Sequence, residues 1–115
     1  MTRMPRYCDG ASFSGLRSDT LPARGDPRLR LHFRGLANLD AALDALFALH
    51  GLADAKEVLV TGGSAGGMAV FLHADRIAAR VRMTAPGVTK LVARPNSVLV
   101  SVAPALECFL ALSRR

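Results

Sequence analysis

The chain has 115 residues, half of them hydrophobic, and a formal net charge of +6 at neutral pH. This length allows one domain at most, and the apolar content excludes a chain that is disordered by composition. No stretch reaches the roughly eighteen apolar residues that a membrane span needs, and the N-terminus lacks the apolar core of a signal peptide.

The positive charge is concentrated at the two ends of the sequence. Nearly all the arginines precede Gly35 or follow Asp75. Basic ends could bind a polyanion, such as nucleic acid or an acidic polysaccharide. However, arginine far outnumbers lysine and alanine is abundant, which indicates a biased coding composition, and no interleaved aromatics support base stacking. We therefore expect no nucleic-acid partner.

The first half of the chain predicts a loop followed by one amphipathic helix. Residues up to Arg28 form a loop in this prediction, apart from a short extended piece at 6–8, and 31–33 is a second extended piece. From Leu36 to His50 the apolar positions repeat at helical spacing, with Asn38 as the N-cap and Gly51 as the C-terminal stop. The apolar face consists of Leu39, Leu43, Leu46, Phe47 and His50.

The second half predicts a strand, a tight turn and a helix, which together make an α/β unit. The strand runs from about Glu57 to Thr61 and the helix from about Ala65 to Arg80. Beyond them we expect turns at Pro86-Gly87 and at Pro95-Asn96. A further strand over 98–102 and a short helix over 106–112 complete the expected elements.

Ser64 lies where a nucleophile elbow would place it. The pattern Gly62-x-Ser64-x-Gly66 joins the strand to the helix, and its glycines allow the sharp turn that exposes the serine hydroxyl. Backbone N–H groups at such a turn point at an incoming carbonyl oxygen. The pattern is typical of esterases, although short Gly/Ser strings also occur as plain turns.

Other kinds of site find less support in the sequence. The glycine-rich turn lacks the spacing and the Lys-Ser/Thr pair of a phosphate-binding loop. Cys8, Cys108 and the three histidines show no spacing typical of metal ligands. We therefore expect neither a metal nor a cofactor.

A serine nucleophile needs a histidine within hydrogen-bond reach, and the local candidates are poor. His73 lies nine residues along the same helix, roughly 13 Å from Ser64 along the axis, so it cannot be the base. His50 reads as a packed or capping residue, and His32 is left as the one weak substitute. Asp9 and Asp75 read first as turn or salt-bridge residues.

Four motifs in order resemble the pectin acetylesterase family, which includes Notum-type carboxylesterases. They are Arg6-Tyr7-Cys8-Asp9-Gly10-Ala11-Ser12-Phe13-Ser14-Gly15, Leu31-His32-Phe33-Arg34-Gly35, Val58-Leu59-Val60-Thr61-Gly62-Gly63-Ser64-Ala65-Gly66-Gly67 and Leu72-His73-Ala74-Asp75-Arg76. The resemblance implies a partial α/β-hydrolase fold, with Ser64 as the nucleophile and the Ala65 N–H as an oxyanion donor. It also implies a secreted enzyme that removes acyl groups from a polysaccharide or a protein.

The resemblance covers residues 1–82 in this interpretation, and 83–115 is a divergent tail, of which we expect Ala85 to Arg115 to pack poorly. The family's Gly-Gly-Gly-Trp loop lies upstream of the Tyr-Cys motif, and its acid and histidine lie further downstream. The chain contains no tryptophan. The motif implies a disulfide at Cys8, and its pairing with Cys108 stays open. Two readings follow: the nucleophile-bearing part of an ester hydrolase, or a truncated fragment without activity.

Overall fold

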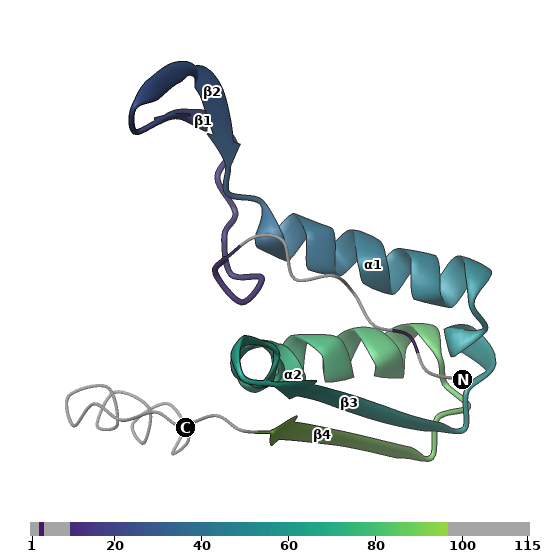
Figure 1. The fold of residues 1–115 in the computed structure, drawn as a ribbon. Helices are drawn as coiled ribbons and strands as arrows, with labels where there is room; N and C mark the ends of the chain where they lie inside the picture. The colour runs from purple at the N-terminus through teal and green to yellow at the C-terminus, as the bar shows by residue number, and fades with distance from the viewer. Residues whose placement is uncertain (1–2, 4–9, 97–115) are drawn as a thin grey trace.

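The computed structural model describes residue 3 and residues 10–96, which form a mixed α/β arrangement (Figure 1). The expected extended piece at 6–8, the strand at 98–102 and the helix at 106–112 lie outside these residues, as do Cys8, Asp9 and Cys108. The elements in chain order are β1 (Thr20–Ala23), β2 (Asp26–His32), α1 (Gly35–Leu49), the 3-10 helix η1 (Leu52–Asp54), β3 (Glu57–Gly63), α2 (Ala65–Thr84) and β4 (Lys90–Asn96).

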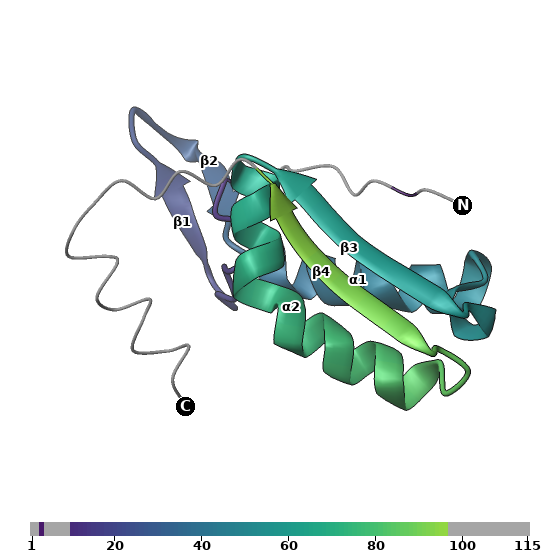
Figure 2. The same ribbon diagram turned by 90° about the horizontal axis from the view of Figure 1, so that it is seen from below.

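The centre of the structure is a β3–α2–β4 unit. β3 and β4 pair in parallel, from Glu57 opposite Lys90 to Gly63 opposite Asn96. Parallel neighbours need a crossover connection, and α2 supplies it. Both helices lie on the same face of this two-stranded sheet, as the views in Figures 1 and 2 agree.

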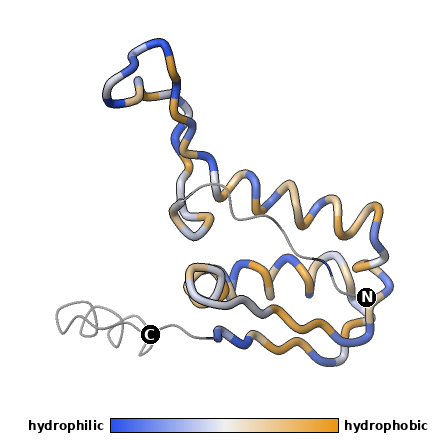
Figure 3. Tube along the Cα trace, in the orientation of Figure 1, coloured by the Kyte–Doolittle hydropathy of each residue, from blue (hydrophilic) through white to orange (hydrophobic). Residues whose placement is uncertain are grey.

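The hydrophobic core lies between the helices and that face of the sheet. Its buried members are Leu39, Leu43, Ile77, Val81 and Ala85, and partly buried residues packed against them include Val58, Val60 and Leu91. Side chains alternate between the two faces of a strand, so every second residue of β3 and β4 points to the helices and is the more buried one. The opposite face leaves Leu59 62% and Val92 40% exposed, and the apolar character of β3 is visible in Figure 3.

The expectation that residues 85–115 pack poorly is wrong for residues 85–96. Ala85 is 1% exposed and belongs to the core, and β4 pairs with β3 along its whole length. Pro86-Gly87 does form the predicted turn, but Pro95 and Asn96 are the last two residues of β4 rather than a turn. A proline is tolerated there because it stands near the end of a strand that has a neighbour on one side only among the described residues.

The predicted loop before Arg28 is also corrected, because it contains most of a β-hairpin. β1 and β2 pair antiparallel, with Thr20 opposite His32, and Gly25 adopts the positive φ of 97° in the turn. Leu31 and His32 are extended as expected. The hairpin projects away from the β3–α2–β4 unit (Figure 1).

Helix α1 matches its prediction except at its N-terminus. It begins at Gly35, and Arg34 occupies the N-cap position without a side-chain capping bond, so Asn38 lies inside the helix. At the other end Gly51 has a φ of 70°, which suits the expected stop. His50 is the C-cap residue and is exposed, so it does not pack on the apolar face.

Carboxylates of α1 pair with arginines of α2. Arg76 donates to both oxygens of Asp40 at 3.0 and 2.6 Å, Arg80 lies 3.6 Å from the same carboxylate, and Arg80 also pairs with Asp44. The hydrogen bond from Arg76 lowers the pKa of Asp40, against the opposing effect of partial burial. These pairs fix how the two helices lie against each other.

We expect Asp40→Asn to lower the free energy of unfolding by about 0.5–1 kcal/mol, because this pair is partly exposed and screened by solvent. Since the folded state lowers the pKa of Asp40, the stabilisation is present above the unfolded pKa and is lost as the pH falls through the folded value. Urea unfolding at pH 7 and pH 3 should therefore show the difference shrinking in acid. Asp75→Asn is the control, because Asp75 is exposed and forms no ion pair with any described residue.

Candidate active site

Ser64 occupies the junction between β3 and α2 in a backbone conformation that L-residues rarely adopt. Its φ is 53° and its ψ is −122°, and the residue is exposed. Such outliers persist only where the surrounding structure holds them, and they cluster at functional sites. The predicted geometry, a strand followed by a strained serine and then a helix, is confirmed; the strand runs two residues further than expected, to Gly63.

One glycine of the turn is required for a close approach of the backbone. A Cβ atom on Gly62 would lie 2.4 Å from the carbonyl oxygen of Gly66, so no side chain fits there. Gly63 and Gly66 face open space and would tolerate a methyl group. Gly62, the first glycine of the pattern, is therefore the one that cannot be replaced by another residue without moving the turn.

The end of β4 holds the elbow in place. The Ser64 N–H donates to the carbonyl oxygen of Asn96 at 3.1 Å. The Asn96 side-chain amide donates to Thr61 Oγ1 at 2.7 Å, and Thr61 Oγ1 donates to the carbonyl oxygen of Arg94 at 2.9 Å. Sequence reasoning missed Asn96, because it predicted a turn at Pro95-Asn96 and no strand between the helix after Ser64 and residue 98; the short apolar run Leu91-Val92-Ala93 was the available signal.

The amide of Ala65 is placed differently from that of Ser64. It opens α2, whose first intrahelical bond in this turn runs from the Met68 N–H to the Ser64 carbonyl at 3.0 Å. The first N–H groups of a helix have no acceptor inside the helix, and the helix dipole makes this end positive. Among the described residues the Ala65 N–H meets no backbone acceptor. This end of α2 thus offers what a developing oxyanion requires.

A loop at residues 10–15 rests on the first turns of α2. The Ser12 hydroxyl donates to the Ala65 carbonyl at 3.1 Å, and His73 Nε2 donates to the Ser12 carbonyl at 2.9 Å. Ser12 and His73 are both buried, and Ser12 and Phe13 have positive φ values of 50° and 60°. His73 is therefore a structural residue that fixes this loop beside the elbow. Its spacing from Ser64 along the helix had excluded it as the base but had assigned it no other role.

The three histidines do not gather around Ser64 as a serine–histidine pair requires. His73 is hydrogen-bonded to Ser12. His50 follows the C-terminal end of α1, which lies near the start of β3, whereas Ser64 follows the end of β3 (Figure 1). His32 is exposed at the end of β2. Asp75 is exposed on α2 and Asp9 lies outside the described residues.

We expect His73→Leu to lower the free energy of unfolding by about 1–3 kcal/mol, because it removes the buried hydrogen bond that His73 donates to the Ser12 carbonyl. His50→Leu, which makes the same chemical change at an exposed position, should change it by less than about 0.5 kcal/mol. Urea denaturation followed by circular dichroism measures both. Equal effects of the two variants would contradict the structural role of His73.

No three histidine, cysteine, aspartate or glutamate residues within the described part of the chain come together as a metal site would require. No helix in that part is both long enough and apolar enough to cross a membrane.

Comparison with known proteins identifies relatives of one kind. Pectin acetylesterase 5 of Arabidopsis thaliana is 47% identical over 70 residues, which make up 61% of this chain and 15% of that protein. Pectin acetylesterase 11 of the same plant is 38% identical over 80 residues, or 70% of this chain and 19% of the relative. The chain thus spans less than a fifth of the length of these relatives. No solved structure gives a significant match.

The family described as Pectinacetylesterase matches residues 4–92 of the sequence. This range contains the elbow, the loop that rests on α2 and the first three residues of β4, the strand that pairs with β3. It is well over half of the 115 residues. The chain belongs to the pectinacetylesterase family.

Proposed function

We propose that this chain carries the serine nucleophile of a carboxylic ester hydrolase that removes acyl groups from oxygen. The observation that carries the proposal is the strained, exposed Ser64 between β3 and α2. In this mechanism Ser64 Oγ attacks the ester carbonyl carbon while a histidine takes its proton. The Ala65 N–H stabilises the oxyanion, the alcohol leaves with the proton, and water then hydrolyses the acyl-enzyme.

The complete site needs parts that this chain does not supply. A histidine base, its carboxylate and further oxyanion donors would come from segments that the relatives have outside the matched region, completing an α/β-hydrolase fold. By analogy with the names of those relatives, the substrate is an acylated polysaccharide such as acetylated pectin. The resemblance to Notum-type carboxylesterases makes an acylated protein the second possibility. Such a substrate places the protein outside the cell.

The second candidate is a fragment without activity of its own. The positions of His73 and His50 favour it for the isolated chain, since neither can serve Ser64 as a base. The two candidates differ in whether Ser64 becomes active once the remaining parts are present.

A chimera tests this difference. The matching 70-residue segment of pectin acetylesterase 5 is replaced by that of this chain, which is 47% identical to it. We expect the chimera to hydrolyse p-nitrophenyl acetate and to be labelled by a fluorophosphonate. Ser64→Ala should abolish the labelling and lower turnover by about 10⁴-fold or more.

Ser18→Ala is the matched control, because Ser18 is exposed and contributes only its backbone carbonyl to a hydrogen bond. It should leave both activity and labelling unchanged. A folded chimera that keeps its activity with alanine at position 64 would refute the role of Ser64. A folded chimera without activity or labelling would favour the inactive fragment.

A further inference from the structure

The β1–β2 hairpin and its base carry much of the chain's excess positive charge. Residues 17–34 contain five arginines against two aspartates, and no other acidic residue. The hairpin also projects from the end of the β3–α2–β4 unit at which β3 finishes, the end that bears Ser64 (Figures 1 and 2). We propose that this hairpin is an arm that binds an acidic polysaccharide through its arginines.

The two aspartates neutralise only two of the five arginines. Asp19 accepts two hydrogen bonds from Arg17, at 3.0 and 2.6 Å, and Asp26 accepts two from Arg28, at 3.1 and 3.2 Å. None of the other three forms an ion pair with a described residue; these are Arg24, Arg30 and Arg34. Their charge is available to a ligand.

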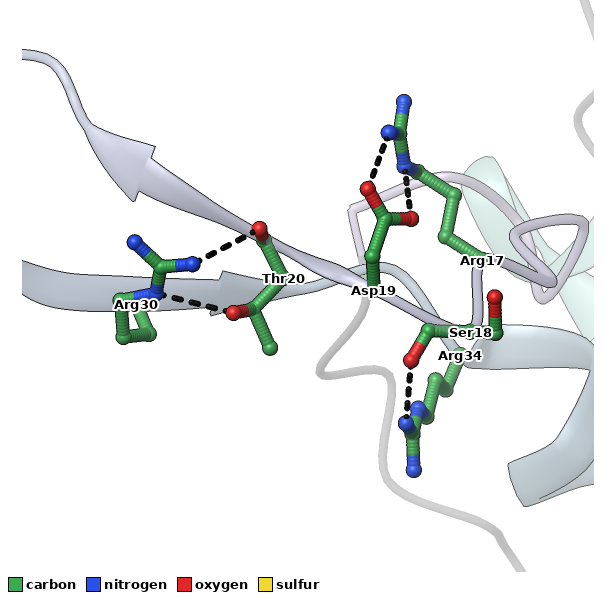
Figure 4. Close-up of polar contacts among 6 residues, drawn as sticks. All are labelled: Arg17, Ser18, Asp19, Thr20, Arg30 and Arg34. Atoms are coloured by element: carbon green, nitrogen blue, oxygen red, sulfur yellow. Dashed lines mark hydrogen bonds and ion pairs between the residues drawn. The ribbon is translucent and has the colours of Figure 1, made fainter.

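Neutral acceptors hold two of these guanidinium groups without cancelling their charge. Arg30 donates from Nε to Thr20 Oγ1 at 2.9 Å and from Nη2 to the Thr20 carbonyl at 3.1 Å (Figure 4). Arg34 donates to the Ser18 carbonyl at 2.8 Å. A guanidinium has five N–H donors, so each group keeps donors for a carboxylate after these bonds are made. Fixing the side chain beforehand lowers the entropy lost when a ligand binds.

The chemistry of the arm favours a polysaccharide carboxylate over a nucleic acid. Phe33 is the one Phe, Tyr or Trp within residues 17–34, and it is half-buried and follows the end of β2, so the strands of the arm carry no such ring on which a base could stack. Arginine recognises the planar carboxylate in a bidentate fashion, and an extended uronic acid polymer presents such groups repeatedly. A polymer bound here would lie at the end of the molecule that carries Ser64. That last step rests on the proposed function, whereas binding itself does not.

The test measures binding of the 115-residue chain to immobilised polygalacturonic acid, which carries no acyl ester. The arm variant combines Arg24→Gln with Arg30→Gln. The matched control combines Arg82→Gln with Lys90→Gln, two exposed cations that form no ion pair with a described residue and lie at the opposite end of the β3–α2–β4 unit. We expect the arm variant to bind about tenfold more weakly, or about 1.4 kcal/mol, and the control to bind within about twofold of the parent.

Three further measurements make the result of the binding test decisive. Fully methyl-esterified pectin, which lacks free carboxylates, should bind weakly, and added salt should weaken the binding of polygalacturonic acid. Ser64→Ala should bind like the parent, so that a failure of the proposed catalysis does not affect the result. Arg24→Gln alone, which removes no hydrogen bond or ion pair with a described residue, should still weaken binding if the double variant does not fold.

The proposal is overturned if the arm variant and the control lose equal affinity, because binding would then depend on net charge alone. It is also overturned if the methyl-esterified polymer binds as well as the acid. Tighter binding of single-stranded DNA, lost in the arm variant, would assign the arm to nucleic acid instead.

Discussion

Purified residues 1–115 will hydrolyse p-nitrophenyl acetate no faster than the same chain with Ser64→Ala. Ser64 lies between β3 and α2 and the Ala65 N–H opens α2, but His73 is bonded to the Ser12 carbonyl and His50 follows the end of α1 remote from Ser64, so neither can activate the serine. Loss of the triad typically lowers turnover by about 10⁴- to 10⁶-fold, and loss of one oxyanion donor by a further 10²- to 10³-fold, roughly. A spectrophotometric assay with the variant as blank measures this directly.

Serine-dependent turnover by the isolated chain, together with fluorophosphonate labelling of Ser64, would contradict that expectation. The base would then have to come from the chain itself. His32→Ala would be the first variant to examine, because His73 is engaged with Ser12 and His50 follows the far end of α1. A matched His50→Ala variant would show whether any histidine substitution has the same effect.

Gly62→Ala should lower the free energy of unfolding by about 2–4 kcal/mol. The new methyl group would lie 2.4 Å from the Gly66 carbonyl oxygen, and because that oxygen belongs to the backbone of the elbow, the turn itself must move. Urea denaturation followed by circular dichroism measures the loss. In the chimera the same substitution should also lower turnover, because Ser64 is the residue between the two clashing positions.

Gly63→Ala is the control for this prediction. A Cβ atom on Gly63 meets no atom within 4 Å, and its φ is not positive, so alanine is compatible with the native conformation. Such a change is neutral or slightly stabilising, because it restricts the unfolded chain. If Gly62→Ala proved as well tolerated as Gly63→Ala, the close approach of Gly66 would not be what shapes the elbow.

The sequence was sufficient to predict the elbow because its signals are local. The apolar run before Gly62, the small residues of the turn and the helical spacing after Ala65 all concern neighbours in the chain. Helix α1 was predictable for the same reason. Its N-terminus was misplaced because Asn38 is a good capping residue, whereas the actual N-cap, Arg34, makes no side-chain cap.

The parts that could not be predicted depend on pairing between distant residues. β4 contains Arg94 and Pro95, which disfavour a strand, yet its partner β3 lies 33 residues earlier and supplies the hydrogen bonds. The hairpin combines Pro22, Gly25 and Pro27 with short strands, so local composition suggested a loop. The Ser12–His73 contact joins residues 61 apart, and no local pattern encodes it.

Both backbone hydrogen bonds that Ser64 forms with described residues join it to the α2 and β4 segments. Its N–H bonds to Asn96 and its carbonyl accepts from Met68, so β3, α2 and β4 set the conformation of the serine within residues 57–96. One continuous stretch of the chain thus holds the elements that set this conformation. We therefore expect residues 57–96 to be exchangeable as one unit between related chains. Recombination between relatives could exchange the surrounding loops and arms, and with them the choice of substrate, while the geometry of the nucleophile is inherited intact.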